Sequence, residues 1–453
     1  MRNDMLSLNR RILLRALMAA SGVAMTPPLF AAVAGAPKAR VVVVGAGVGG
    51  ATAAKYIRMF DPGIDVTVIE KNAHYIRPYG STEVLTGAVT MDDLCVSYDP
   101  LKARDVKFVQ DTAVALDGVK KVVTCKSGKK LPYDFLIVAP GVELLYEKYP
   151  GLTEEIADTK ITCGWIPGAQ TALLRKQLLA MPEDGTFLIC PPPNPYRCPP
   201  GPYERAALLT EWTGKYKPRA KIIVADPKNG FTADITMLMA WNHLYGFMPP
   251  EPFKTKLDGH LKDPRPDCRI KWITKNDGGT VKEVDVKNMT VITEGAGAIK
   301  ADVINIIPPM RAGRIALDMG LANETGFCPI DRRTFESTVI KSVYVLGDSS
   351  IADAMPKSGF SANTQAKVAA RAIVETVNGR PIPEPAWANT CYALASDEWG
   401  MFVADTFRLV DGKIARTNTR ARYQFLTAGD AERRVAARYL RSWIRTITAD
   451  SFY

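Results

Sequence analysis

The segment Arg40-Val41-Val42-Val43-Val44-Gly45-Ala46-Gly47-Val48-Gly49-Gly50 decides the fold. Its β-branched run, residues 40–44, predicts a buried strand, and the glycines that follow predict a tight turn into an alanine-rich helix that ends near Phe60. A second apolar run, residues 65–69, predicts another buried strand, which ends at Glu70. Strand, glycine turn, helix and strand together predict a dinucleotide-binding βαβ unit.

Each glycine of this loop has an expected role. Gly45 permits the tight turn, Gly47 lets the backbone approach a pyrophosphate, and Gly50 lets the helix pack closely against the strand. The helix N-terminus then faces the phosphate charge. The candidate cofactor contacts in the loop are Gly45, Gly47, Gly49 and Gly50.

The acid that ends the second strand restricts the cofactor. Glu70 is expected to accept hydrogen bonds from the ribose hydroxyls and to repel a 2′-phosphate, which favours FAD or NAD over NADP. The next residue, Lys71, is a further candidate for cofactor contact.

Two later segments favour FAD. Residues 135–141 predict a buried strand and a tight turn that resembles the Ala-Thr-Gly turn of flavoproteins with two dinucleotide domains, with Pro140 in place of Thr. Residues 343–348 predict a strand that delivers an acid, which in those flavoproteins binds the ribityl and phosphate part of FAD. The candidate contacts are Ala139, Gly141, Gly347 and Asp348.

A second dinucleotide fold is expected to begin with the strand at residues 185–190. A proline-rich segment, residues 191–202, stands where its glycine loop should be. Proline lacks the backbone N–H that would bind pyrophosphate, so we expect no seat for a nicotinamide cofactor.

The fold class that follows is α/β, with two Rossmann-like domains that resemble those of the glutathione-reductase type. A C-terminal interface domain is added by the family resemblance given below. A chain of 453 residues is too long for one core. The expected divisions are an export signal (1–36), the FAD-binding domain (37–150 and 291–380), the second dinucleotide fold (151–290) and the C-terminal domain (381–453).

The first residues favour export. Arg10-Arg11-Ile12-Leu13-Leu14-Arg15 precedes an uncharged stretch from Ala16 to Ala36, which resembles a twin-arginine signal and predicts a periplasmic protein. Gly22, Pro27 and Pro28 make this stretch a poor membrane span, so we expect none in the mature chain. An uncleaved anchor is the alternative.

Composition restricts the partners. The net charge of +11 comes without aromatic interleaving or a nucleic-acid motif, so an acidic protein partner is favoured and nucleic acid is not. Eight cysteines show no Cys-x-x-Cys, and there are only three histidines, so neither a metal site nor covalent haem is expected. Any haem must belong to a partner subunit.

Four unusual runs resemble one family. They are residues 198–206 (CPPGPYERA), 305–313 (NIIPPMRAG), 355–363 (MPKSGFSAN) and 389–392 (NTCY). All are similar to segments of the flavoprotein subunit of flavocytochrome c sulfide dehydrogenase. This family belongs to the FAD-dependent pyridine nucleotide-disulfide oxidoreductases and is related to sulfide:quinone reductase.

The resemblance implies a reaction. Family members take two electrons from sulfide through a redox disulfide and pass them to a c-type cytochrome subunit. Cys198 and Cys391 match the disulfide pair, whose chemistry is attack by a sulfide anion to form a persulfide and a thiolate. A purely structural disulfide is the alternative for two cysteines of an exported protein.

Two charged residues match further family positions. Glu204 is a candidate proton acceptor near the disulfide if burial raises its pKa, and the alternative is a helix N-terminal glutamate that interacts with the dipole. Lys357 matches a position at the pyrimidine edge of the flavin, where a cation stabilises negative charge; the alternative is a solvated loop lysine. The C-terminal domain around Cys391 is expected to close the flavin pocket and face the cytochrome.

One position departs from the family. Pro78 stands where better-studied members have a cysteine that binds the flavin covalently, and proline has no nucleophilic atom. We therefore expect non-covalent FAD. Cys95 and Tyr79 are the nearby residues that could substitute.

Two other functions stay open. The first is a quinone-linked sulfide oxidoreductase of the same fold, although the arginines of residues 433–453 are unlike an apolar bilayer-entering helix. The second is a non-catalytic flavoprotein subunit of a sulfur-oxidising complex, which the retained Cys198, Cys391 and Glu204 disfavour.

Overall fold

The computed structural model describes residues 36–417 and 422–453. Residues 38–453 form one compact unit. The export signal expected over residues 1–36 lies outside the described residues, apart from its last one, and stays a prediction. Within the described part of the chain, no helix is long and apolar enough to cross a membrane.

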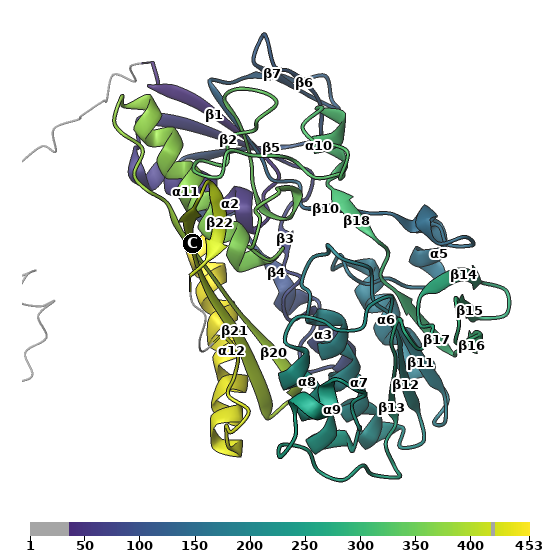
Figure 1. Ribbon diagram of the computed structural model, residues 1–453. Helices are drawn as coiled ribbons and strands as arrows, with labels where there is room; N and C mark the ends of the chain where they lie inside the picture. Colours follow the sequence, from purple (N-terminus) through teal and green to yellow (C-terminus); the bar gives the residue numbers. More distant parts are fainter. Residues whose placement is uncertain (1–35, 418–421) are drawn as a thin grey trace, which may run out of the picture. The chain divides into compact units, whose positions relative to one another are not determined.

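The first domain is built on a parallel five-stranded sheet, ordered β19-β9-β1-β2-β5. The helices α2 (Val48–Phe60) and α11 (Gly359–Val377) pack against each other beside this sheet (Figure 1). The strands β1, β9 and β19 are nearly continuous apolar runs, as expected for a sheet covered on both faces, whereas β2 and the edge strand β5 include polar residues. Their bounds are β1 (Ala39–Val44), β2 (Ile64–Glu70), β5 (Val106–Gln110), β9 (Phe135–Val138) and β19 (Val343–Val345).

The second domain repeats this plan with a parallel four-stranded sheet, ordered β13-β12-β11-β17. The bounds are β11 (Thr186–Cys190), β12 (Lys221–Ala225), β13 (Ile270–Ile273) and β17 (Val303–Ile306), with helices α6 (Ala169–Ala180), α7 (Gly201–Tyr216) and α8 (Asp234–Tyr245). Two Rossmann-like sheets in one chain confirm the expected fold class.

The second domain extends past residue 290, where the sequence placed its end. The strand β17 pairs with β11 and completes the second sheet, so the boundary lies after Ile306. The chain passes from the first domain to the second and back again. The two connecting segments pair with each other as short antiparallel strands, β10 (Val142–Leu144) and β18 (Met310–Ala312). A parallel strand gives no local sign of the strand with which it will pair, which is why the boundary was misplaced.

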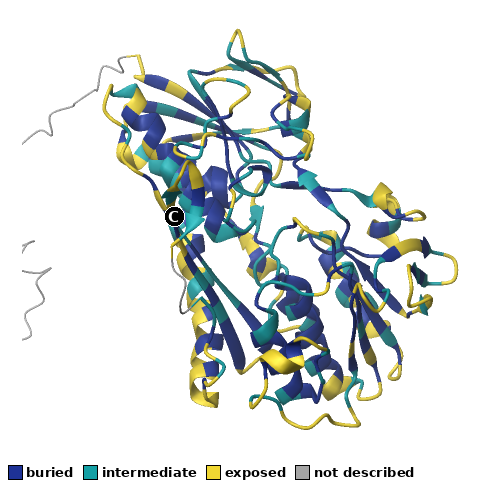
Figure 2. Cartoon of the chain, viewed as in Figure 1, coloured by how far each residue is buried: buried dark blue, intermediate teal, exposed yellow. Residues whose placement is uncertain are grey.

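The C-terminal domain is an antiparallel sheet of β20 (Ala386–Ser396), β21 (Trp399–Val410) and β22 (Lys413–Arg416), covered by α12 (Asp430–Phe452). The strand β20 packs against α11 of the first domain and α7 of the second. The outer side of α12 is exposed along its length, whereas most residues of the two parallel sheets are buried (Figure 2). This domain therefore closes over the junction of the two Rossmann-like domains.

The remaining elements are small. Two antiparallel sheets are peripheral additions to the domains: β6 (Ala113–Asp117), β7 (Val122–Cys125) and β8 (Lys130–Pro132), and β14 (Val281–Asp285), β15 (Thr290–Thr293) and β16 (Ala298–Lys300). The others are β3 (Tyr75–Ile76), β4 (Cys95–Val96), α3 (Ser81–Thr86), α4 (Asp99–Lys102), α5 (Glu154–Thr159), α9 (Phe253–Lys256) and α10 (Arg314–Asp318).

Candidate active site

The glycine loop joins β1 to α2 with very little room on its inner side. Gly45 has a φ of +90°, and a Cβ there would lie 2.6 Å from the carbonyl oxygen of Ala139. A Cβ on Gly50 would lie 1.9 Å from the oxygen of Gly45. At Gly47, by contrast, a Cβ would meet only the ring of Tyr75, at 3.9 Å. The loop is therefore closed toward the protein and open on the side that would face a cofactor.

The acid Glu70 lies beside this loop. Its Oε2 accepts a hydrogen bond from the Ala46 N–H (2.8 Å), and Oε1 accepts one from the Asn72 N–H (2.9 Å). Carboxylate oxygens retain further lone pairs for ribose hydroxyls. Gly45, Glu70 and Lys71 line one cavity of about 450 Å³. The cavity has the size and the donors and acceptors to hold the adenosine part of FAD.

Asp348 lies at the end of β19, where a second set of cofactor contacts is expected. Its Oδ1 is buried and has no hydrogen-bond partner within the described chain, and burial raises the pKa of this carboxyl. Gly347 before it has a φ of +69°, and Gly141 has a φ of +70°. An orphaned buried oxygen at this point fits a ribityl hydroxyl of FAD.

Lys357 is enclosed, unlike a solvated loop lysine. Its Nζ donates to the carbonyl oxygens of Asp348 (2.7 Å) and Ser350 (3.0 Å) and lies 3.9 Å from the centre of the Phe327 ring. Burial lowers the pKa of this amine to about 8, with the nearby Asp348 carboxylate opposing the shift. The ammonium group is thus held next to Asp348, the residue expected to contact the ribityl part of FAD.

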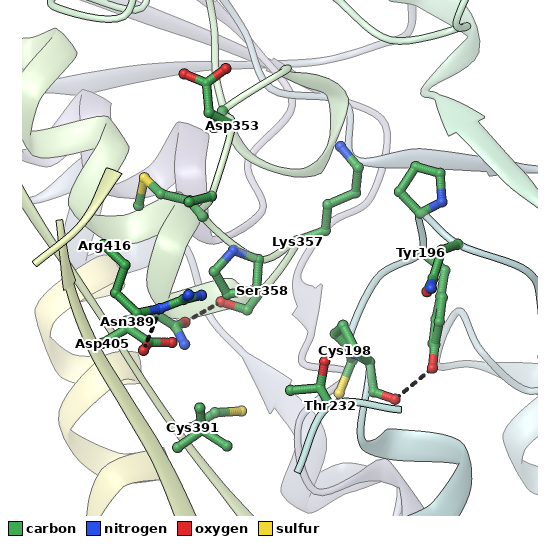
Figure 3. Close-up of a pocket in the computed structure, with 18 of the residues that line it drawn as sticks. Tyr196, Cys198, Thr232, Asp353, Lys357, Ser358, Asn389, Cys391, Asp405 and Arg416 are labelled. Carbon is green, nitrogen blue, oxygen red and sulfur yellow. Dashed lines mark hydrogen bonds and ion pairs between the residues drawn. The ribbon is translucent and has the colours of Figure 1, made fainter. Parts of the chain in front are cut away.

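Cys198 and Cys391 line the same two cavities although they come from different domains. Cys198 lies in the proline-rich segment with a φ of +57°, and its N–H donates to the Lys357 carbonyl (2.9 Å). Cys391 lies on β20. Both are free thiols, and both line a wide cavity of about 590 Å³ (Figure 3). Packing of the C-terminal strand against the second domain creates this pair.

The same two thiols also line a smaller cavity of about 100 Å³, which we call the chamber. The pKa of the Cys198 thiol is raised to about 12, mainly by burial and in smaller part by the carboxylates of Glu204 and Asp348, while Arg197 opposes the shift. The pKa of Cys391 is raised well above its usual value, first by burial. With these raised pKa values both thiols are protonated near neutral pH. Because the thiolate is the reactive form, a proton acceptor is needed nearby.

Glu204 in the chamber can supply that acceptor. It lies in the first turn of α7, and its Oε1 accepts a hydrogen bond from the Leu394 N–H of β20 (2.8 Å). The carboxylate therefore binds a different element and not the N–H groups of its own helix. Burial raises its pKa to about 8; the Leu394 N–H opposes this shift, and Glu83 across the chamber adds to it. A carboxyl with this pKa can exchange protons near neutral pH.

Among the chamber residues that the sequence did not single out are Glu83, Trp165, Arg197 and Arg205. Glu83 is 4% exposed and forms an ion pair with Arg441 (3.0 Å) at the surface. Trp165 Nε1 donates to the Arg197 carbonyl (3.2 Å), and the Arg197 guanidinium donates back to the Trp165 carbonyl. Of these four residues, only Arg205 lies in a run that resembles the family, residues 198–206, where it directly follows Glu204.

Pro78 also lines the chamber and offers no nucleophile. Of the two possible substitutes, Cys95 is exposed, pairs with Ile76 on β3, and does not line the chamber. Tyr79 does line it, but its hydroxyl lies 3.3 Å from Thr448 Oγ1, and burial raises its pKa to about 12. Cys95 thus lies outside the chamber, and burial disfavours the phenolate form of Tyr79.

The proline-rich segment of the second domain is closed. Lys228 Nζ donates to the Pro192 carbonyl (2.6 Å) and forms an ion pair with Asp226 (2.8 Å). Asp226 follows β12 and is fully buried, with further hydrogen bonds from the Tyr203 hydroxyl (2.5 Å) and Trp272 Nε1 (3.0 Å). The chain's own side chains therefore satisfy the polar groups that a pyrophosphate and ribose would use.

Three family models match the chain. The central part of the sulfide dehydrogenase [flavocytochrome c] flavoprotein chain matches residues 171–308, and the flavin-binding part of flavocytochrome c sulphide dehydrogenase matches residues 383–452. Pyridine nucleotide-disulphide oxidoreductase matches residues 39–176. The chain belongs to the flavocytochrome c sulfide dehydrogenase flavoprotein family. This flavoprotein is thus an oxidoreductase with FAD-binding domains, which confirms the family and the cofactor class inferred from the sequence.

Individual relatives agree with this family. The chain is 54% identical over 37 residues to the sulfide dehydrogenase [flavocytochrome c] flavoprotein chain of Chlorobaculum thiosulfatiphilum, covering 8% of this chain and 77% of that one. It is 23% identical to the sulfide-quinone reductase of Aquifex aeolicus, in a match that covers 81% of this chain and 83% of that one. It is 25% identical to the mitochondrial sulfide:quinone oxidoreductase of Mus musculus, in a match that covers 68% of this chain and 65% of that one. The match thus spans about two thirds of the mouse protein.

Solved structures share the fold of this flavoprotein. The sulfide:quinone oxidoreductase of Aquifex aeolicus superposes with a TM-score of 0.67 at 20% identity, covering 91% of this chain and 92% of that one. An NAD-dependent persulfide reductase from A. fulgidus superposes with a TM-score of 0.59 at 14% identity, covering 89% and 77%.

Proposed function

We propose that this flavoprotein oxidises sulfide, or a related small reduced sulfur compound, through a redox disulfide formed by Cys198 and Cys391. The observation that supports it most is that both thiols line the wide cavity and the chamber, and that Glu204 lines the chamber with them. The names of the family models and relatives point to the same substrate class.

The chemistry of the chain's own residues follows. In the oxidised pair, hydrosulfide attacks one sulfur, a new S–S bond forms to give a persulfide, and the old S–S bond breaks to leave a thiolate on the other cysteine. Glu204 takes the proton that the attacking sulfur or a thiol gives up. Bound FAD supplies a two-electron acceptor that can release electrons one at a time. Lys357 and Asp348 would hold it in place.

Anaerobic addition of sulfide to the holoprotein tests this function. Wild type should bleach its flavin absorbance, and Cys198→Ser and Cys391→Ser should each slow bleaching by at least about a thousandfold while FAD stays bound. Cys95→Ser, an exposed thiol outside both cavities, is the matched control and should bleach normally. Normal bleaching in either cavity variant would contradict the disulfide mechanism, and no bleaching of wild type would favour a non-catalytic subunit.

The proposed electron acceptor is a c-type cytochrome subunit that carries the haem. The family models that cover the central and C-terminal parts support it. A quinone is the second candidate, because several curated relatives are named for quinone. Native purification should give a stable complex with a haem protein, and turnover with sulfide should reduce that cytochrome at least about tenfold faster than a water-soluble quinone. The reverse preference would assign the quinone.

FAD is proposed to be bound non-covalently, in a periplasmic protein exported by the twin-arginine signal. Acid precipitation should release yellow FAD and leave a polypeptide of unmodified mass. A mass increased by one FAD would contradict this. Fusion of residues 1–36 to a reporter that requires prior folding tests export, and an Arg10→Lys, Arg11→Lys variant should retain the reporter in the cytoplasm.

A further inference from the structure

Arg205 is the most enclosed arginine of the described chain, with 2% of its surface exposed. Its Nη1 donates to Asn305 Oδ1 (2.8 Å) and the Cys163 carbonyl (3.3 Å), and Nη2 donates to the Gly164 carbonyl (3.0 Å). The Asn305 amide is held in this orientation because its Nδ2 donates to the Thr162 carbonyl (2.8 Å). All the acceptors around the guanidinium are therefore neutral.

No carboxylate of residues 36–417 and 422–453 forms a close ion pair with Arg205, and the Glu204 carboxylate interacts with its charge only at longer range. No carboxylate lies within 4.0 Å of it, and its Nε is buried without a hydrogen-bond partner. The Trp165 ring, 5.2 Å from the guanidinium carbon, offers a cation–π attraction that is smaller than the free-energy cost of burying the charge. An apolar side chain of the same volume would serve packing better. The arginine is therefore explained by an anion that is present when the protein works.

The chamber is where such an anion would lie. Arg205 lines it together with Cys198, Cys391 and Glu204. Burial lowers the pKa of the guanidinium to about 10, and this shift is opposed by Cys163, Cys198 and Glu204 in their charged forms. Of these, Cys198 and Glu204 line the chamber. Both are protonated at moderate pH, because burial raises the pKa of each.

We propose that Arg205 forms an anion subsite in the chamber that binds a small sulfur anion, hydrosulfide, next to Cys198. This inference rests on the proposed function and names the charged form of its substrate. The guanidinium supplies the positive charge, Trp165 covers its face, and the Asn305 amide fixes its direction. Neutral hydrogen sulfide would gain nothing from this subsite, so the subsite selects the anion.

Thiol alkylation of the reduced holoprotein tests the subsite without turnover. Iodoacetate is an anion and iodoacetamide is its neutral analogue, so the ratio of their rate constants at Cys198, measured by peptide mass, reports the local charge. Differences in thiol reactivity cancel in this ratio. In Arg205→Met the iodoacetate-to-iodoacetamide ratio should fall about tenfold or more, and Arg205→Lys should retain part of it. Steady-state assays of Arg205→Met should show a raised KM for sulfide with a smaller change in kcat.

Arg433→Met is the matched control. Arg433 is also buried, with 3% exposed, stacks 3.9 Å from the Trp399 ring and donates to a backbone carbonyl, but does not line the chamber. Its ratio should equal that of wild type. An unchanged ratio in folded Arg205→Met, or a ratio in folded Arg205→Lys that falls as far as in Arg205→Met, would overturn the subsite. A changed ratio in a protein whose flavin is not reduced by sulfide would keep the subsite and reject the proposed reaction.

Discussion

The two parallel sheets carry the same strand–loop–helix unit, but one loop is open and the other is filled. In the first domain, Gly45 of the glycine loop and the half-buried Glu70 line a cavity of about 450 Å³. In the second, Asp226 stands at the matching strand end but is fully buried and bonded to Lys228, Tyr203 and Trp272. The same topology can therefore seat a cofactor or, once the loop is filled, position a reactive side chain such as Cys198.

The largest effect is expected from a variant that disrupts the open glycine loop. In Gly50→Val, the new Cβ would lie 1.9 Å from the Gly45 oxygen, a backbone atom that cannot move aside. Bound FAD per chain should fall by at least about tenfold, measured by flavin absorbance after desalting. Gly429→Ala is the control, because a Cβ there meets only the Glu432 carboxylate at 3.9 Å. Wild-type FAD content in Gly50→Val would show that the loop does not hold the cofactor.

The next largest effect is expected from a variant that disrupts the filled loop of the second domain. Lys228→Met leaves the buried Asp226 carboxylate without its cation and should destabilise the protein by about 3–5 kcal/mol, measured by urea unfolding. The double variant Asp226→Asn, Lys228→Met removes both charges and should recover part of that loss. Equal stability of Lys228→Met and wild type would mean that the ion pair does not hold the segment closed.

A smaller effect concerns the chemistry that the filled loop positions. Glu204 must be ionised to accept a proton, and its pKa is raised to about 8, so sulfide-dependent flavin reduction should rise as pH increases through about 8 and level off above it. Data are corrected for the ionisation of sulfide itself. Glu204→Gln should lower the rate about a hundredfold and remove this rise. Persistence of the rise in Glu204→Gln would assign it to another group.

The last prediction is that nicotinamide cofactors have no effect on the flavin. NADH and NADPH should not reduce the flavin at a useful rate, because Lys228 and the prolines occupy the loop where their pyrophosphate would bind. Stopped-flow mixing with up to millimolar NADH measures this, with sulfide as the positive control. Saturable reduction at micromolar NADH would show that the second loop is open in solution.

Local pattern was sufficient for much of the fold. The first strand was expected at residues 40–44 and is observed as β1, Ala39–Val44, and the strand before Glu70 was expected at residues 65–69 and is observed as Ile64–Glu70. Short apolar runs next to glycine or an acid carry their own boundaries. The boundary placed at residue 290 failed because β17 acquires its identity only from its pairing with β11.

The sequence by itself determined the two dinucleotide folds, the loss of the second glycine loop, the family and the residue types of the site. Only the tertiary structure decided that Lys357 is enclosed, that Glu204 binds β20, and that Arg205 is buried without a close ion pair. The physical reason is that burial and charge pairing depend on which surfaces three domains bring together. Strand and turn preferences act over a few neighbouring residues, whereas the chamber joins side chains from α3, α7, β20 and α12.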